Sequence, residues 1–369
     1  MSAGFSDIIR TTPELERACA QTGAEGILSL DTEFVWMSTY RPRLGLVQLG
    51  CRSACWGFDC LTGAHTDALR DQIENPSVLK ILHDARQDLT HLHRLTGAFP
   101  KHVFDTQLAA AFAGFPAGTG LQKLLFEAIG VGLPKTETCT DWTRRPLSEA
   151  QVAYALDDVR YLPALRDELL ARADRFGTRA WLEEELTKYD EPSLYADFDP
   201  EAVWTRIKLH RVRLDPHGFA ILKAVATLRE EIARELNVPR NWAGEDGSLI
   251  DMAERHALGM LRHRLNGGQA EIVRAKYRRA IEEALSLSEE ECPENPHIRY
   301  IPEVLDAADR ALAWLRERAE EIHVDAAAIA NRATVTAYVD NVEDGSNPLS
   351  TGWRYEAAGQ EMATLFGVD

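Results

Sequence analysis

Two acidic side chains, Asp31 and Glu33, stand two residues apart near the start of the chain. Residues 26–34 begin with β-forming types and read as a strand, in which positions i and i+2 share a face. Neighbouring carboxylates repel unless a cation joins them, and hard divalent ions such as Mg²⁺ prefer oxygen ligands. The pair therefore indicates a metal site, although either acid alone would more often be an ordinary surface residue.

A second pair, Tyr154 and Asp158, lies on an expected helix. Ser148 and Gln151 fit the S-x-x-Q pattern that caps a helix start, so the helix is expected from residue 149 onward. The spacing i, i+4 places Tyr154 and Asp158 on one face. Asp157 is rotated by about 100° and reads as a solvated neighbour. The alternative for Tyr154 is a core aromatic on the helix face.

Residues 81–89 contain a third acidic element, which runs from a short expected strand into a helix. Asp84 occupies the expected N-cap position, and Asp88 follows about one turn later. Either acid alone is unremarkable. The informative feature is the order along the chain: a strand with D-x-E, then an acid at a helix start, then a helix with Y-x-x-x-D.

The elements that must position these acids form an α/β pattern. Residues 24–60 read as three successive strands separated by turn residues, which suggests an antiparallel meander. Beyond residue 64, helical periodicity alternates with short strand candidates. The helices are expected at about 64–74, 85–96, 106–113, 119–129 and 148–170, and the strands at 78–82 and 102–105. A meander followed by βα units predicts a mixed sheet flanked by helices.

Length and composition bound the class of protein. The chain has 369 residues, of which 45% are hydrophobic and 27% are charged, which suits a soluble protein of two or three domains. No apolar run is long enough for a membrane helix, and the N-terminus lacks the pattern of a signal peptide, so a cytoplasmic location without membrane contact is expected. Six cysteines are too few for a disulfide scaffold.

Two acidic, proline-containing stretches, 189–200 and 288–296, read as linkers. They divide the chain into three expected pieces at 1–195, 200–288 and 297–369. The net charge of −17 is uneven, because residues 201–280 carry a net charge of +5 while the parts on either side are acidic. A whole-protein basic surface is excluded, and contact with nucleic acid would be local to the middle piece.

With these motifs in place, the chain resembles the ribonuclease D family, in the tyrosine-containing subclass of the DEDD exonucleases. The resemblance rests on Asp31-Thr-Glu33, on His83-x4-Asp88 and on Tyr154-x3-Asp158, with support from the segments 40–49, 104–107 and 140–147. It implies a ribonuclease H-like, mixed-sheet exonuclease domain followed by two all-α, HRDC-like domains. HRDC domains are small helical modules that bind nucleic acid.

The resemblance also implies roles for the acids. Asp31, Glu33, Asp88 and Asp158 would bind two divalent metal ions, Mg²⁺ or Mn²⁺, with Asp31 shared between them. Tyr154 would be the catalytic tyrosine. Because an ordinary tyrosine has a pKa near 10, it is a poor base at neutral pH, and we expect it to orient the attacking water. Two metal ions would stabilise both the attacking and the leaving oxygen of a phosphodiester.

The expected substrate is RNA, with tRNA precursors the family expectation. The 3′ end would enter the active site of a protein expected to be a monomer. Cations interleaved with aromatic residues are typical of nucleic-acid surfaces, although any single arginine is about as often part of a solvated face. The candidate contacts are Arg240, Trp242, Arg274, Lys276, Arg278 and Arg279 in the middle piece, and His83, Arg86, Arg144 and Arg145 nearer the acids.

The sequence thus predicts a metal-dependent 3′–5′ exoribonuclease that releases nucleoside 5′-monophosphates and trims the 3′ ends of structured RNA. Two alternatives stay open. The same enzyme could act on DNA, since the sequence alone does not reveal recognition of a 2′-hydroxyl. The chain could also be a binding protein without catalysis, although a catalytically inactive copy has no reason to keep four clustered carboxylates.

Overall fold

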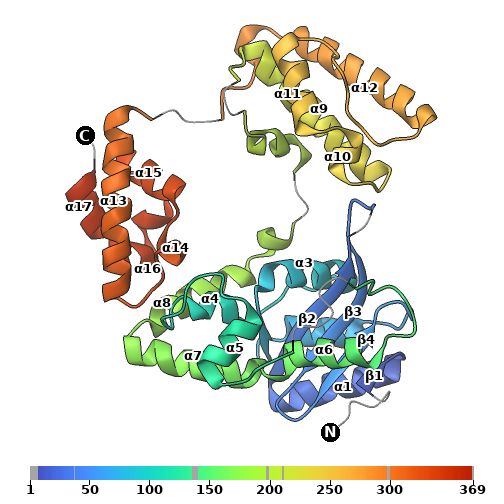
Figure 1. Cartoon of the computed structure of the whole chain (residues 1–369), viewed down its shortest axis with the longest axis vertical. Coiled ribbons are helices and arrows are strands. Elements are labelled where there is room, and N and C mark those ends of the chain that lie inside the picture. The colour runs from blue at the N-terminus through green and yellow to red at the C-terminus, as the bar shows by residue number, and fades with distance from the viewer. Residues whose placement is uncertain are drawn as a thin grey trace. The chain divides into compact units, whose positions relative to one another are not determined.

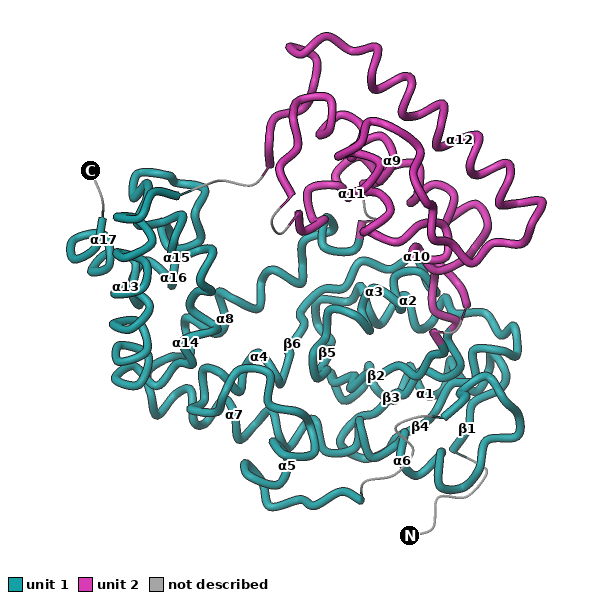
Figure 2. Tube along the Cα trace, turned by 45° about the horizontal axis from the view of Figure 1, so that its top comes forward, with its two compact units in different colours: residues 1–35, 44–195, 300–369 teal, residues 36–43, 196–299 magenta. Residues whose placement is uncertain are grey.

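The computed structural model describes residues 7–36, 38–134, 140–196, 199–209, 212–296 and 300–367. Its contacts divide the chain into two compact units, coloured separately in Figure 2. Unit 1 contains residues 1–35, 44–195 and 300–369, and unit 2 contains residues 36–43 and 196–299. The expected acidic motifs all belong to unit 1.

Unit 1 is built on a six-stranded mixed sheet, in the order β1-β4-β3-β2-β5-β6. Its strands are β1 (Ile8–Ile9), β2 (Ile27–Val35), β3 (Arg43–Gly50), β4 (Cys55–Asp59), β5 (Leu79–Leu82) and β6 (Val103–Asp105). Strands β3 and β4 are antiparallel, with Val47 opposite Phe58. Strand β5 runs parallel to both β2 and β6. The mixed sheet expected from the sequence is confirmed.

Helices pack against this sheet, as Figure 1 shows. They are α1 (Thr12–Glu25), α2 (Asp67–Glu74), α3 (Ala85–Thr96), α4 (Thr106–Ala110), α5 (Leu121–Ile129), α6 (Glu149–Arg160), α7 (Leu162–Phe176) and α8 (Arg179–Leu186). Helices α1, α3, α6 and α7 all contact β2, the strand that carries the first acidic pair. Central position in the sheet and burial on both sides hold that strand in place.

The helix start at Ser148 is confirmed, because Ser148 and Gln151 form a reciprocal capping box. The single helix expected over 148–170 is wrong, since α6 ends at Arg160 and α7 begins at Leu162. Pro163 explains the break, because its ring is tolerated only in the first turn of a helix. The sequence interpretation also missed β1 and α1.

The C-terminal residues of unit 1 are helical and share its core. Their helices are α13 (Pro302–Glu321), α14 (Ala326–Ile329), α15 (Arg332–Asp340), α16 (Gly352–Arg354) and α17 (Gln360–Phe366). Trp353, only 1% exposed, packs edge-on against Phe112 with ring centroids 4.9 Å apart. One hydrophobic cluster therefore runs from the sheet into this segment. The division into three pieces at 1–195, 200–288 and 297–369 stays a prediction.

Unit 2 is helical and has its own core. Its helices are α9 (Pro216–Glu235), α10 (Arg240–Ala243), α11 (Asp246–Arg255) and α12 (Gly267–Leu285), preceded by the 3-10 helix η4 (Pro200–Arg206). Tyr40 belongs to this unit because its hydroxyl donates to Glu230 and accepts from Arg234 Nε at 2.9 Å. Across the described parts of both units, every helix is too short or too polar to span a lipid bilayer.

Candidate active site

Three carboxylates from two elements meet in unit 1. Asp31 and Glu33 come from β2, and Asp158 comes from α6. One oxygen of each lies within 4.8 Å of an oxygen of the other two. Gln48, in the neighbouring strand β3, donates from Nε2 to Asp31 Oδ2 at 3.2 Å and fixes that carboxylate. The structure therefore assembles three of the four expected acids at distances that suit shared cations.

Asp88 stands beside this cluster, on α3. It is only 8% exposed, and its Oδ1 accepts a hydrogen bond from the hydroxyl of Thr32. Thr32 also lies 3.3 Å from Nδ1 of His91, one turn further along α3. Burial, followed by the negative charge of Asp31, raises the pKa of Asp88 well above its usual range. Asp88 therefore lies within the field of the other acids, although outside the closest trio.

Burial and mutual repulsion disfavour ionisation of the trio. Loss of water, followed by the charge of Asp158, raises the pKa of Asp31 to about 8. Burial and the neighbouring acids raise the pKa of Glu33 to about 9, and burial followed by Asp157 raises that of Asp158 to about 7. Among the described residues, no basic side chain forms an ion pair with the trio. Partly buried carboxylates without a counter-charge are a donor set that divalent cations prefer, so the residues fit such ions.

Tyr154 lies one helical turn from Asp158 and is half-buried. Its ring centroid is 6.2 Å from that of Trp142. Burial, followed by the charge of Asp158, raises its pKa, so the hydroxyl keeps its proton at neutral pH. Tyr154 and Asp158 line a cavity of about 190 Å³, whose wall also contains Gln122 of α5. The tyrosine is thus placed to hydrogen-bond a molecule beside the acids.

The residues near the acids that were expected to contact RNA differ from one another in exposure and in hydrogen-bond partners. Arg86 and Arg144 are exposed, whereas His83 is half-buried with Nδ1 2.9 Å from the hydroxyl of Thr106. Arg145 binds both carboxylate oxygens of Asp59 at 2.7 Å. Its remaining donors go to three backbone carbonyls. All five N–H groups are used inside the domain, and the expected phosphate contact of Arg145 stays a prediction.

The candidate contacts of unit 2 lie on α10 and α12. Arg278 and Arg279 are exposed, and Arg279 pairs with Glu283 at 2.7 Å. Lys276 pairs with Glu235 at 3.1 Å. Arg240 is exposed beside Glu230, while Trp242 and Arg274 are partly buried. Surface pairs of this kind contribute about 0–1 kcal/mol, so the cations remain available to a polyanion.

Sequence reasoning missed three residues that organise the site, namely Thr32, Gln48 and Asp105. Thr32 stands between the two acids of β2, and alternation along the strand sends its side chain to the opposite face, toward α3. Gln48 is polar and yet fully buried. Its apolar neighbours in the strand are the sequence signal that could have indicated this burial. Asp105 ends β6 and accepts backbone hydrogen bonds. The segment 104–107 signalled a family resemblance but no role for this acid.

A mixed sheet with clustered acids on its central strand and on adjoining helices defines the 3′–5′ exonuclease class. Residues 6–174 match the model of a 3′–5′ exonuclease family. The chain is 34% identical to ribonuclease D of Acidiphilium cryptum, over 98% of this chain and 93% of that protein. It is 31% identical to ribonuclease D of Zymomonas mobilis, over 97% and 93% respectively.

The similarity extends over the helical parts as well. The crystal structure of Escherichia coli RNase D, an exoribonuclease involved in structured RNA processing, matches with a TM-score of 0.85 and 27% identity, covering 97% of both chains. The chain therefore belongs to the ribonuclease D family and is a 3′–5′ exoribonuclease.

Proposed function

We propose that this exoribonuclease uses two divalent metal ions to trim the 3′ ends of structured RNA precursors, tRNA among them, and releases nucleoside 5′-monophosphates. The observation that carries the proposal is the partly buried cluster of Asp31, Glu33 and Asp158, whose carboxylates lack a basic partner among the described residues. Processing of structured RNA is the role of the similar Escherichia coli enzyme.

Four acids would hold the two ions. The charge of Asp31 acts on both Glu33 and Asp88, which suits a carboxylate shared by both ions. Glu33 and Asp158 would complete one site, and Asp88 would support the other. When bound, the ions would supply the positive charge that lowers the pKa of water and stabilises the attacking and leaving oxygens. Mg²⁺ and Mn²⁺ both suit carboxylate and water ligands.

Tyr154 would orient the attacking water rather than remove its proton. The raised pKa keeps the phenol protonated at neutral pH, so it acts through a hydrogen bond. The adjoining cavity, bounded by Gln122, Pro134 and Asp157, is large enough for part of a terminal nucleotide. Tyr154 would then contact both the water and the 3′-terminal residue of the substrate.

The body of the RNA would lie on unit 2. Residues 201–280 have a net positive charge, whereas the parts of the chain before and after them are net negative. Helix α12 of this region carries Arg274, Lys276, Arg278 and Arg279. We propose residues 200–288 as an HRDC-like module that binds RNA, and residues 297–369 as a second, divergent one. We further propose that the protein acts as a monomer in the cytoplasm, where tRNA precursors are processed.

Charge neutralisation tests the proposed RNA surface. Changing the four cations of α12 to glutamine should weaken RNA binding and make the dependence of log affinity on log salt shallower, by about 0.7 per lost phosphate contact with single strands. Glutamine at Arg17, Arg175 and Arg316, exposed arginines outside the basic region, is the matched control. An unchanged affinity and salt slope in the α12 variant would remove unit 2 from the RNA path.

Substrate choice is tested with matched RNA and DNA hairpins that carry unpaired 3′ ends and a 5′ label. We expect Mg²⁺-dependent shortening of the RNA, one nucleotide at a time, with nucleoside 5′-monophosphates as products. Faster trimming of the DNA hairpin would make DNA the substrate. Binding of both without cleavage under Mg²⁺ or Mn²⁺ would favour a non-catalytic role.

A further inference from the structure

One buried carboxylate in unit 1 joins three elements. Asp105, 3% exposed, ends β6 and begins α4. Its Oδ1 accepts from the backbone amides of Asp84, Gln107 and Leu108 at 3.1, 2.8 and 3.2 Å. Its Oδ2 accepts from the amide of Ala85 at 3.0 Å and from the hydroxyl of Tyr189 at 2.5 Å. Five donors on one buried carboxylate make this a rigid junction.

The junction determines where α3 begins. Asp84 stands at the N-cap of α3 with a φ of 59°, a left-handed conformation that is uncommon outside glycine. Its side chain makes no capping hydrogen bond. Asp105 performs that task from a different element by accepting the amides of Asp84 and Ala85. Asp88 follows one turn later, so the position of its carboxylate depends on this start.

Tyr189 closes the junction from the other side. It lies in the 3-10 helix η2 (Thr187–Asp190), is 4% exposed, and donates its hydroxyl to Asp105. Burial and the charge of Asp105 raise the pKa of Tyr189, so this hydrogen bond persists across neutral pH. The hydroxyl of Tyr195 donates to the Tyr189 carbonyl at 2.6 Å and holds the segment in place.

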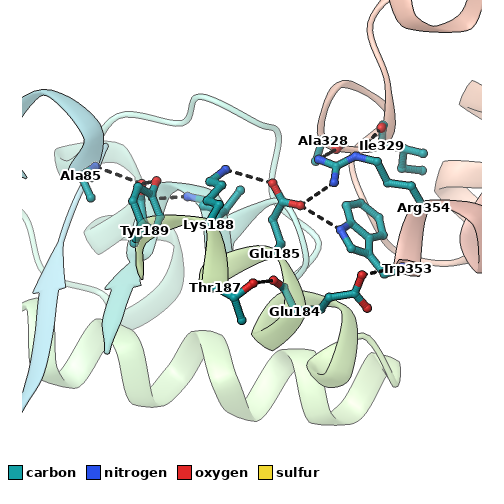
Figure 3. A network of polar contacts seen from close by, with 12 residues as sticks. Ala85, Glu184, Glu185, Thr187, Lys188, Tyr189, Ala328, Ile329, Trp353 and Arg354 are labelled. Atoms are coloured by element: carbon teal, nitrogen blue, oxygen red, sulfur yellow. Dashed lines mark hydrogen bonds and ion pairs between the residues drawn. The ribbon is translucent and has the colours of Figure 1, made fainter. Parts of the chain in front are cut away.

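Helix α8, which directly precedes η2, is docked against the C-terminal helices, as Figure 3 shows. Glu185 of α8 accepts from Trp353 Nε1 at 2.9 Å and from Arg354 Nη1 at 2.5 Å. Its other oxygen accepts from Lys188 Nζ at 2.9 Å, and Lys188 precedes Tyr189. A continuous set of polar contacts thus leads from the C-terminal helices through η2 to the first turn of α3.

We propose that Tyr189 and Asp105 are positioning residues for metal binding, which hold Asp88 in register with Asp31 by fixing the start of α3. The inference rests on the proposed function, in which Asp88 supports one metal ion. It gives the segment 187–195, whose residues lie far from the acidic motifs in sequence, a role in metal binding. The C-terminal helices would then support catalysis by holding η2, in addition to any contact with RNA.

Tyr189→Phe tests this inference, because it removes only the hydroxyl and keeps the buried ring. We expect the Mn²⁺ affinity of the metal-free protein, measured by calorimetry, to fall roughly three- to tenfold. In cleavage assays, kcat at limiting Mg²⁺ should fall and recover at saturating Mg²⁺, while KM for RNA stays unchanged. Amide hydrogen exchange at residues 84–88 should accelerate, a measurement that needs neither metal nor activity.

Tyr338→Phe is the matched control. Tyr338 is a buried tyrosine of the same unit whose hydroxyl donates to the Gly359 carbonyl at 3.0 Å, away from Asp105. If both variants show the same Mn²⁺ affinity and the same exchange at the start of α3, the inference is wrong. A wild-type protein that binds no Mn²⁺, or an Asp88→Asn variant that binds it normally, would instead overturn the proposed metal site.

Discussion

Asp31 is the carboxylate whose charge acts on Glu33, Asp88 and Tyr154. Burial and Asp158 raise its pKa to about 8, so the folded protein disfavours its ionised form. Below pH 4 Asp31 is protonated in both the folded and the unfolded chain, so it does not lower the stability of the fold. As the pH rises, the unfolded chain loses this proton first, and stability falls until the folded group ionises near pH 8.

Asp31→Asn should therefore stabilise the metal-free protein while abolishing cleavage. In chelator at pH 8.5 we expect the free energy of unfolding to rise by on the order of 1–3 kcal/mol, as measured by thermal unfolding. This gain should shrink toward zero at pH 4. Asp174→Asn is the control, because Asp174 is exposed, pairs with Arg179 at 3.2 Å and should give no such gain. A pH-independent effect of Asp31→Asn would contradict the charge repulsion described for this site.

Tyr154→Phe should separate orientation of water from metal binding. Because the phenol keeps its proton at neutral pH, its loss should lower kcat by roughly 10²-fold without moving the alkaline limb of the pH–rate profile. Mn²⁺ affinity should match that of the wild type. An alkaline limb that disappears in the variant would show instead that the tyrosine ionises during catalysis.

Residue types and spacing predicted much of this site. Strand and helix periodicity correctly placed Asp31 with Glu33, and Tyr154 near Asp158, because both pairs depend only on local geometry. Contacts between elements that lie far apart in the sequence could not be predicted from local patterns. Thr32 to Asp88 and Arg145 to Asp59 depend on which elements pack together. Sequence reasoning accordingly gave no sign that Arg145 binds Asp59, and its assignment to RNA stays a prediction.

At the level of elements, Glu185 is the buried carboxylate among the α8 residues that bind the C-terminal helices. Burial alone would raise the pKa of Glu185, but hydrogen bonds from Arg354 and Trp353 outweigh it and lower the pKa to about 2. A depressed folded pKa stabilises the protein above the ordinary value of 4.5, and this stabilisation is lost as the pH falls toward 2.

Glu185→Gln should thus destabilise the protein at neutral pH and have less effect in acid. We expect a loss of roughly 1–3 kcal/mol in the free energy of unfolding at pH 7, since the partly buried Arg354 keeps only part of its hydrogen bonding. Denaturant unfolding at several pH values measures the difference, which should shrink between pH 4.5 and pH 2. Glu183→Gln, on the exposed side of α8, is the control. A pH-independent difference would contradict the role of the Glu185 charge.

Elements with strong periodicity were easier to predict than their boundaries. The meander, α3 and α5 follow from apolar spacing and turn residues. Helix α1 was missed because its start depends on Thr11 and Glu14, a capping box that its mainly polar sequence obscures. The break between α6 and α7 has a local cause in Pro163, although the apolar pattern continues across it.

For the whole molecule, the structure joins the C-terminal helices to the catalytic core through Trp353. Trp353→Ala should lower the free energy of unfolding by about 3–5 kcal/mol, in the same transition in which exonuclease activity is lost. Trp204→Ala, in the core of unit 2, is the control and should leave the midpoint of activity loss less affected. An unchanged catalytic midpoint in Trp353→Ala would favour residues 297–369 as an independent domain.

The uneven charge of the chain is also a whole-molecule property. A net charge of −17 disfavours indiscriminate binding of polyanions, and we propose that RNA contact depends on the basic middle segment. The acids of unit 1 that contribute to this charge include the four that would hold metal ions. Activity should consequently depend strongly on both divalent ions and ionic strength.

The dependence of RNA cleavage on divalent ions tests the central claim most directly. Wild-type protein is freed of metal with chelator and then titrated with Mg²⁺ on 5′-labelled, 3′-extended RNA, beside Asp31→Asn. We expect no cleavage in chelator, stepwise 3′ shortening as Mg²⁺ is restored, and none at any Mg²⁺ concentration in the variant. Cleavage that persists in excess chelator, or in Asp31→Asn at wild-type rates, would contradict a metal-dependent carboxylate centre.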